Sequence, residues 1–138
     1  SYEVPLGEAA VRREGSDVSV YTYGAMTRPT MEAAENLAEE GIDAEVIDLR
    51  TVSPLDEETI VDSFEKTGRG VVVHEAPESG GLAGEITATI QEEALLYQEA
   101  PIARVTGFDV PFPLHALEDY YMPEPARIAD SIRDAVEF

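Results

Sequence analysis

The spacing of apolar residues changes along the chain, and the clearest change lies between residues 69 and 97. The unbroken β-branched run of residues 71–73 is typical of a strand that is covered on both faces of a parallel sheet. Three glycines at positions 80, 81 and 84 then predict a loop, because glycine avoids the Cβ clashes that restrict other residues. Apolar residues at helical spacing follow and predict a helix whose buried stripe is Leu82, Ile86, Ile90, Ala94 and Tyr97.

Three further strands are predicted elsewhere in the chain. Short runs rich in valine, isoleucine and tyrosine, bounded by turn residues, place them at residues 17–23, 44–49 and 102–106. A short extended piece is also predicted at residues 9–11. The strand at residues 71–74 ends in a polar residue, His74. In open α/β sheets, binding and catalytic residues lie preferentially at the carboxyl ends of the strands.

Helices are predicted between these strands. One begins at Thr27, interpreted as its cap, and stops at Gly41. Another follows the turn at Ser53 and ends before Gly68, and the last runs from about Pro125 to near the end of the chain. The alternation of strand and helix predicts an α/β domain with a mainly parallel sheet.

The domain organisation follows from length and composition. A chain of 138 residues predicts one domain. Residues 1–16 have no long period and are interpreted as a linker with an N-terminal extended segment, and residues 17–138 as the domain. The connection at residues 107–124 holds aromatic residues among prolines. Such a long connection either packs its own aromatics against the domain or forms a docking surface, and both interpretations stay open.

Charge excludes some classes of partner. The chain has 29 acidic and 9 basic residues and a formal net charge of −20. The acids are scattered rather than grouped in a tail, which favours adaptation to very high salt over an acidic partner-binding surface. The regular periodicities argue against disorder. Nucleic acid is not an expected partner, because phosphate contacts need lysine and arginine.

The expected compartment is the cytoplasm. No cysteine is present, which excludes disulfides and thiolate metal sites. No apolar run approaches the roughly 20 residues that span a bilayer, so no membrane is expected as a partner. The chain begins at Ser1 without a methionine, which suggests a fragment of something longer.

Candidate chemistry is sparse. His74 could act as a general base with Glu75, but adjacent strand residues point to opposite faces, which favours a packing or hydrogen-bonding role at a domain interface. The glycines at 80–84 lack the lysine of a phosphate loop and are interpreted as a tight turn. Only His74 and His115 could ligate a metal through imidazole, and no serine lies in a nucleophile elbow. No catalytic, cofactor-binding or metal-binding residue is therefore predicted. A domain without such residues is typical of one component of a larger protein assembly.

Several segments in order along the chain resemble the β subunit of the thiamine-dependent 2-oxo acid dehydrogenases. The resemblance spans essentially the whole chain. Its segments include Pro-Leu-Gly-Glu-Ala at 5–9, Arg-Glu-Gly at 13–15, Glu-Val-Ile-Asp-Leu-Arg-Thr at 45–51, Lys-Thr-Gly-Arg at 66–69, His-Glu-Ala-Pro at 74–77, Glu-Ala-Pro at 99–101 and Asp-Val-Pro-Phe-Pro at 109–113.

The resemblance implies the C-terminal domain of that subunit, the transketolase C-terminal fold. This fold is a three-layer α/β/α domain with a mixed, mainly parallel sheet of about five strands, one of them antiparallel. The implied full enzyme oxidatively decarboxylates a branched-chain 2-oxo acid or pyruvate and transfers the acyl group to lipoamide. The implied partners are an α subunit and a second β subunit in an α2β2 assembly, and the dihydrolipoyl acyltransferase core.

The resemblance also implies where the cofactors and contacts lie. Thiamine diphosphate and magnesium would bind in the full enzyme, outside this domain, so the isolated domain is predicted to be inactive. In related complexes an acidic residue that matches Glu99 and the terminal residue, here Phe138, face the small binding domain of the acyltransferase. Together with His74 and Glu75, which are singled out by their place at a strand end, the interface candidates are His74, Glu75, Glu99 and Phe138.

Two alternatives remain open. One is the C-terminal domain of a transketolase or deoxyxylulose-phosphate synthase. The other, from a different class, is a stand-alone α/β module that binds a small ligand.

Overall fold

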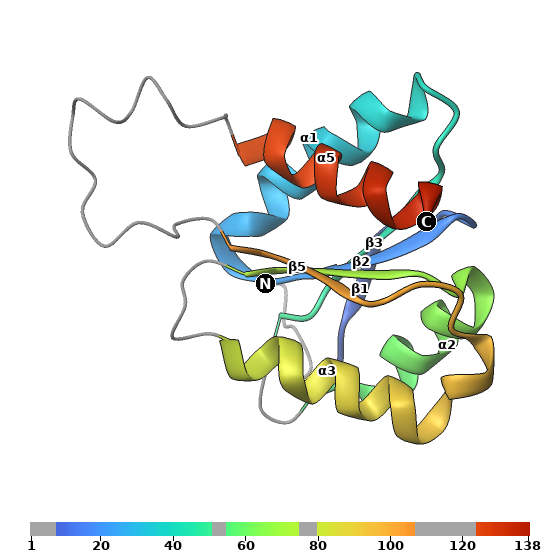
Figure 1. The fold of residues 1–138 in the computed structure, drawn as a ribbon. Helices are drawn as coiled ribbons and strands as arrows, with labels where there is room; N and C mark the ends of the chain where they lie inside the picture. The colour runs from blue at the N-terminus through green and yellow to red at the C-terminus, as the bar shows by residue number, and fades with distance from the viewer. Residues whose placement is uncertain (1–7, 51–54, 75–79, 107–123) are drawn as a thin grey trace.

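A five-stranded sheet with helices on both of its faces makes up the domain (Figure 1). The computed structural model describes residues 8–50, 55–74, 80–106 and 124–138. Within these residues the strand order is β1-β3-β2-β4-β5. The predicted strand at residues 71–73 is confirmed as β4, which lies between two other strands. Residues 51–54, 75–79 and 107–123 are outside the description, and with them Ser53, Glu75 and His115.

The sheet is mixed, as the resemblance implies. Strand β2 pairs in parallel with β3 and β4, β4 pairs in parallel with β5, and β1 pairs antiparallel with β3 at one edge. The extended piece expected near residues 9–11 is this antiparallel strand. The strand bounds are β1 Ala10–Arg13, β2 Val18–Thr22, β3 Ala44–Asp48, β4 Gly70–His74 and β5 Ala103–Thr106.

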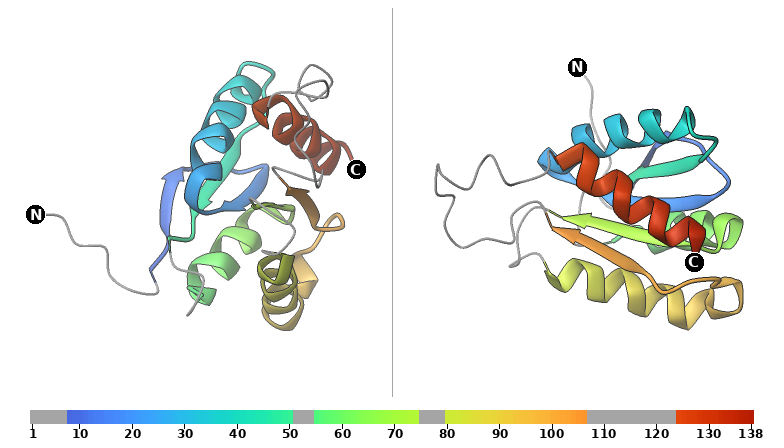
Figure 2. Two further views of the ribbon diagram at one scale, coloured as in Figure 1. Left: turned by 90° about the vertical axis from the view of Figure 1, so that its left-hand side faces the viewer. Right: turned by 45° about the horizontal axis from the view of Figure 1, so that its top comes forward.

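Two helices cover each face of the sheet, which gives three layers (Figure 2). One face carries α1 (Thr27–Ala38) and α5 (Glu124–Glu137). The other carries α2 (Glu57–Thr67) and α3 (Gly80–Glu93). Two 3₁₀ turns, η1 and η3, complete the described elements, at Gly24–Met26 and Leu95–Tyr97.

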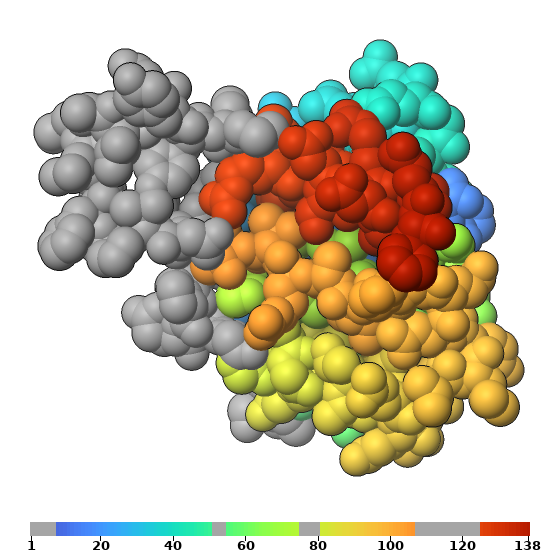
Figure 3. All heavy atoms as spheres, in the orientation of Figure 1, coloured from blue at the N-terminus to red at the C-terminus, as the bar shows by residue number. Residues whose placement is uncertain are grey.

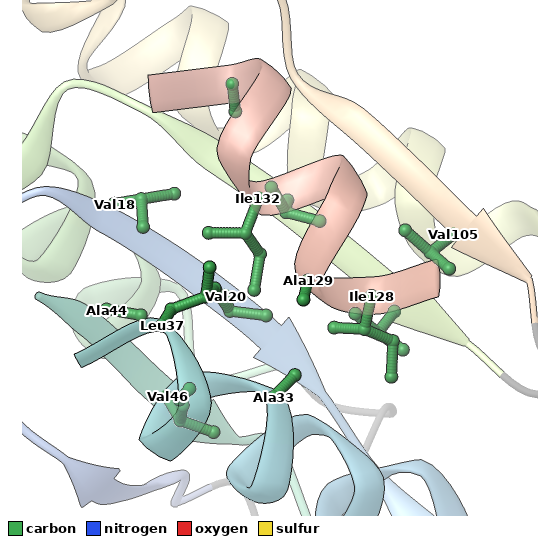
Figure 4. Close-up of a cluster of buried hydrophobic side chains, with 14 of the residues drawn as sticks. Val18, Val20, Ala33, Leu37, Ala44, Val46, Val105, Ile128, Ala129 and Ile132 are labelled. Atoms are coloured by element: carbon green, nitrogen blue, oxygen red, sulfur yellow. The ribbon is translucent and has the colours of Figure 1, made fainter. Parts of the chain in front are cut away.

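The two-residue period of the strands divides the core between the faces. Valines 18 and 20 of β2 point toward α1 and α5, whereas Tyr21 points toward α2 and α3. In the first of these clusters, Figure 4 shows Ile132 of α5 directed toward β2 beside Leu37 of α1. Because both faces of β2 and β4 are buried, these strands are mostly apolar. The hydroxyl of Ser19 within β2 is hydrogen-bonded to Ser63 and Thr67.

Helix α2 illustrates how local residues set the ends of an element. Asp56 is its cap, and the carboxylate Oδ1 accepts a hydrogen bond of 3.1 Å from the amide of Thr59. At the other end Gly68 has a φ of 72°, the left-handed conformation that stops a helix. Ile60 and Phe64 face the sheet between these two signals and are fully buried. The predicted stop at Gly68 is therefore confirmed.

The glycine loop predicted at positions 80–84 is wrong, because all of these residues lie in the first turns of α3. Leu82 and Ile86 are buried against the sheet. Glycine inside a helix costs roughly 0.5–1 kcal/mol per residue, whereas burying a leucine or isoleucine side chain gains about 1.5–3 kcal/mol. Burial therefore outweighs the weak helix propensity of the glycines.

Two further expectations about helix ends are also wrong. Thr27 is the first helical residue of α1 rather than its cap, and among the described residues its hydroxyl is one of two buried side-chain oxygens without a hydrogen-bond partner. Tyr97 does not continue the stripe of α3, because that helix ends at Glu93 and Ala94 has a φ of −141°. The turn η3 instead leaves the Tyr97 side chain half exposed.

Candidate functional site

His74 lies at the carboxyl end of β4, in the interior of the fold. Only 3% of the residue is exposed, and its Nε2 atom is 3.4 Å from the hydroxyl of Thr106 on the neighbouring strand β5. A buried imidazole that bonds across two strands agrees with a packing role better than with a general base that must reach substrate. Glu75 follows it in the sequence but lies outside the described residues.

The described part of the chain offers little for a metal or a membrane. No group of three or more histidine, aspartate and glutamate side chains in it could hold a metal ion. None of its helices is long and apolar enough to cross a bilayer. An open groove of about 330 Å³ runs between β5 and α5, lined by Arg104, Arg127, Asp130 and Asp134 among others. Its two arginines and two aspartates leave this groove without a net charge.

Arg69 joins three segments at the opposite end of the sheet, where the parallel strands begin. It lies in the turn between α2 and β4. Its Nε donates a 3.0 Å hydrogen bond to the carbonyl of Ala135 in the last turn of α5. Its NH1 donates to the Glu99 carboxylate at 3.2 Å, just before β5. The Arg69 side chain is 23% exposed and that of Glu99 is 58% exposed, so the acid remains open to a partner.

Gly68 allows the close approach of the segment that carries Glu99. The amide of Glu99 donates a 2.8 Å hydrogen bond to the Gly68 carbonyl. A Cβ atom on Gly68 would lie 2.4 Å from Glu99 Oε2 and 2.7 Å from the carbonyl oxygen of Tyr97. Together with the positive φ, these distances require glycine at this position.

Exposed apolar side chains come mainly from the segments that Arg69 joins. The five large hydrophobic residues exposed in the described structure are Leu95 at 56%, Leu96 at 98%, Tyr97 at 50%, Phe138 at 75% and Val11 at 47%. Three belong to η3 and one follows α5. Figure 3 shows the end of α5, in dark red, next to the orange segment that leads into β5. We call Glu99, the η3 residues Leu95–Tyr97 and Phe138 the amino-edge surface.

A buried carboxylate paired with a half-exposed lysine lies at the same end of the sheet. Glu45 is 3% exposed, and its Oε1 accepts hydrogen bonds from the Gly15 amide, at 3.1 Å, and from the Lys66 ammonium. The hydrogen bond to Glu45 raises the pKa of Lys66 above its usual value. Both donors therefore compensate the burial of the Glu45 carboxylate and tie β3 to α2 and to the chain before β2.

The structure separates the three interface candidates that lie in its described residues. Glu99 and Phe138 lie in segments that Arg69 joins. Arg69 directly precedes β4 and His74 is its last residue, so His74 lies at the opposite end of the parallel strands. Sequence reasoning did not assign a role to Arg69, although it lies in the Lys-Thr-Gly-Arg segment. The sequence signal that could have indicated Arg69 is the helix stop at Gly68, because the residue after this glycine lies directly before the next strand.

A family model described as "Transketolase, C-terminal domain" matches residues 7–128 of the chain. The chain is 49% identical over 139 residues to the 2-oxoisovalerate dehydrogenase subunit beta, mitochondrial, of Dictyostelium discoideum. It is 46% identical over 137 residues to the pyruvate dehydrogenase E1 component subunit beta of Bacillus subtilis (strain 168). Both matches cover 99% of this chain, but only 37% and 42% of the length of those relatives.

A solved structure of a split gene transketolase, an inactive beta4 tetramer, has a similar fold. The TM-score is 0.82 at 31% sequence identity, and the match covers 99% of this chain and 43% of the other. The mixed five-stranded sheet with helices on both faces therefore agrees with a transketolase-like architecture.

Proposed function

The chain belongs to the family of transketolase C-terminal domains, and from this premise we propose that it is the assembly domain of the β subunit of a thiamine-dependent 2-oxo acid dehydrogenase. The observation that carries the proposal is 49% and 46% identity to two such β subunits over 99% of the chain. The transketolase structure, at 31% identity, favours the C-terminal domain of a transketolase as the second candidate.

The activity belongs to the full enzyme in this proposal. That enzyme decarboxylates a 2-oxo acid and passes the acyl group to lipoamide, and the names of the two relatives suggest 2-oxoisovalerate or pyruvate as the substrate. The partners are the α subunit, a second β subunit and the acyltransferase core. The expected location, the cytoplasm, stays a prediction.

Thiamine diphosphate and magnesium are expected in the full enzyme, and the described residues do not fit either group. A diphosphate needs cationic or amide donors, yet acidic residues outnumber basic ones 29 to 9 in this chain. Magnesium needs gathered oxygen ligands, and no group of three candidates occurs in the described ranges. We therefore assign the cofactors to other parts of the enzyme and derive no chemical step for this domain.

We further propose that the amino-edge surface docks the small binding domain of the acyltransferase. Exposed apolar side chains beside a half-exposed carboxylate are typical of a protein-binding surface. The acid suits a basic group on the partner, because complementary charges steer and orient docking. His74, which is buried, and Glu75 remain interface candidates only for another subunit.

Glu99→Gln in the full-length β subunit, assembled with its α subunit, is expected to weaken binding of the purified small binding domain about tenfold, because a charge-assisted hydrogen bond is lost. Binding is measured by calorimetry at one fixed KCl concentration. Decarboxylation with an artificial electron acceptor, which does not need the core, is expected to be unchanged. Glu35→Gln, an exposed acid of α1, is the charge-matched control.

Two results would contradict these proposals. Equal binding by the Glu99→Gln and Glu35→Gln enzymes would remove Glu99 from the docking site. Loss of decarboxylation in the Glu99→Gln enzyme would show that the domain takes part in the chemistry, against its role in assembly.

We also propose that the domain is adapted to high salt. With 29 acids and 9 bases, 20 acids would stay unpaired even if every basic residue neutralised one acid. At about 0.1 M salt the Debye length is about 10 Å, so these charges repel across much of the domain, whereas at about 1 M it is about 3 Å.

Lowering KCl from about 3 M to about 0.1 M is expected to lower the melting temperature by roughly 10 °C or more, which corresponds to a few kcal/mol of charge repulsion for a domain of this size. The melting temperature is followed by circular dichroism. The variant Glu92→Gln/Glu93→Gln, which removes two exposed adjacent charges at the end of α3, is expected to be less sensitive to salt. A flat response of the unmodified chain would refute the adaptation.

A further inference from the structure

We propose that Arg69 is a positioning residue of the amino-edge surface, which fixes the Glu99 carboxylate and the last turn of α5 in one arrangement before a partner arrives. The inference rests on the docking function proposed above. It adds a residue that does not itself belong to the exposed contact surface, because its side chain is only 23% exposed.

The guanidinium of Arg69 suits this role because it donates in two fixed directions. Its Nε bonds the Ala135 carbonyl at 3.0 Å, while NH1 bonds Glu99 Oε1 at 3.2 Å. The planar group sets the angle between these two donors, so the two acceptors cannot move independently. A lysine would place a single point charge here, without the two fixed donor directions of the guanidinium.

The Glu99 carboxylate is restrained from its backbone as well as from its tip. Its amide donates to the Gly68 carbonyl at 2.8 Å, so the main chain is attached to the residue directly before Arg69. Its other carboxylate oxygen, Oε2, occupies the space beside Gly68 that a Cβ atom would fill. A long side chain that is 58% exposed would otherwise sample several rotamers, and fixing it on docking would reduce affinity.

The bond to α5 extends the same restraint to Phe138. The Ala135 carbonyl belongs to the last turn of the helix, where carbonyls have no partner within the helix. A cation at this end also interacts favourably with the helix dipole. Phe138 follows three residues later and is 75% exposed, so the turn that Arg69 holds determines where this side chain projects.

Positioning and simple neutralisation predict opposite effects of removing Arg69. If Arg69 only neutralised Glu99, its loss would increase the negative potential of the surface and tighten binding of a basic partner. If it positions Glu99 and the end of α5, its loss frees both groups and weakens binding.

The test uses the full-length β subunit assembled with its α subunit and the purified small binding domain of the acyltransferase, at one fixed KCl concentration. Arg69→Gln is expected to weaken binding about tenfold, as Glu99→Gln does. The double variant is expected to bind about as weakly as either single variant, because both substitutions break the same interaction between Arg69 and Glu99 and their effects are then not additive. Arg12→Gln, which removes an exposed arginine of β1 that pairs with Asp48 of β3, is the charge-matched control and is expected to bind like the unmodified enzyme.

Arg69→Lys separates positioning from charge, since it keeps the charge and is expected to bind nearly as weakly as Arg69→Gln. Tighter or unchanged binding by Arg69→Gln, while Glu99→Gln weakens it, would overturn the role of Arg69 and leave docking intact. Full recovery in Arg69→Lys would also overturn it. No binding by the unmodified enzyme would overturn both proposals. Melting temperatures of all variants within a few degrees of each other are expected, and a large fall for Arg69→Gln alone would assign Arg69 to stability instead.

Discussion

Phe64→Ala is expected to lower the free energy of unfolding by about 3–5 kcal/mol, which is the range for removing a large aromatic side chain from a core. Phe64 lies on α2, is fully buried and belongs to the cluster that joins α2 and α3 to the sheet. Its ring also lies beside the first residue of β4, since a Cβ atom added to Gly70 would be 3.4 Å from it. The ring therefore lies among the apolar side chains of α2, α3 and the sheet and beside the start of β4, so its removal would leave a cavity in this cluster.

Urea denaturation at one fixed KCl concentration measures this loss. Natural domains have free energies of unfolding of only about 5–15 kcal/mol. If the unmodified domain lies near the lower end of that range, the variant is expected to be partly unfolded even without urea. Phe138→Ala, the same substitution at a side chain that is 75% exposed, is the control and is expected to change stability by no more than about 0.5 kcal/mol. Equal losses at the two positions would show that Phe64 does not anchor this face of the sheet.

Gly15→Ala is expected to destabilise the domain by about 3 kcal/mol, at the upper end of the range for overpacking a core. The added Cβ would lie 2.4 Å from the carbonyl carbon of Ala44 and 2.6 Å from the amide nitrogen of Glu45. Both are backbone atoms of β3, so no flexible side chain can move away. The shift would also break the bond from the Gly15 amide to the buried Glu45 carboxylate.

Gly84→Ala is the matched control for this prediction. Gly84 is exposed on α3, and a Cβ atom there would have no neighbour within 4 Å. Because alanine is the better helix former, this variant is expected to gain roughly 0.5–1 kcal/mol. Thermal unfolding of both variants under the same conditions compares them, and a Gly15→Ala protein as stable as the unmodified chain would rule out the close contact with β3.

The sequence predicted the sheet better than the ends of the helices. The valines of β4 could be read as a buried strand because burial on both faces requires a continuous apolar run, and the structure confirms this. The start of α3 was not predictable in the same way, because the glycines there favour a loop locally. The packing of Leu82 and Ile86 into the core cluster beneath the sheet reverses that local preference.

The candidate site shows the same limit of local patterns. Glu99 and Phe138 were available from the resemblance to a known family, but no local signal connects either of them to Arg69. The two acceptors of Arg69 lie 30 and 66 residues away in the sequence, so their meeting depends on the finished order of strands and helices. His74 shows the converse, since its place at a strand end was predictable while its bond to Thr106 on another strand was not.

The place of α5 in the fold sets the order in which the domain can be completed during synthesis. This helix is made after all the other described elements, yet its Ile128 and Ile132 lie in the core beside α1. Arg133 also binds both carboxylate oxygens of Glu40 at 2.7 Å, across 93 residues of sequence. Until α5 has been made, the valines of β2 and β4 on this face therefore lack part of their cover, and such transiently exposed apolar surfaces are what chaperones bind.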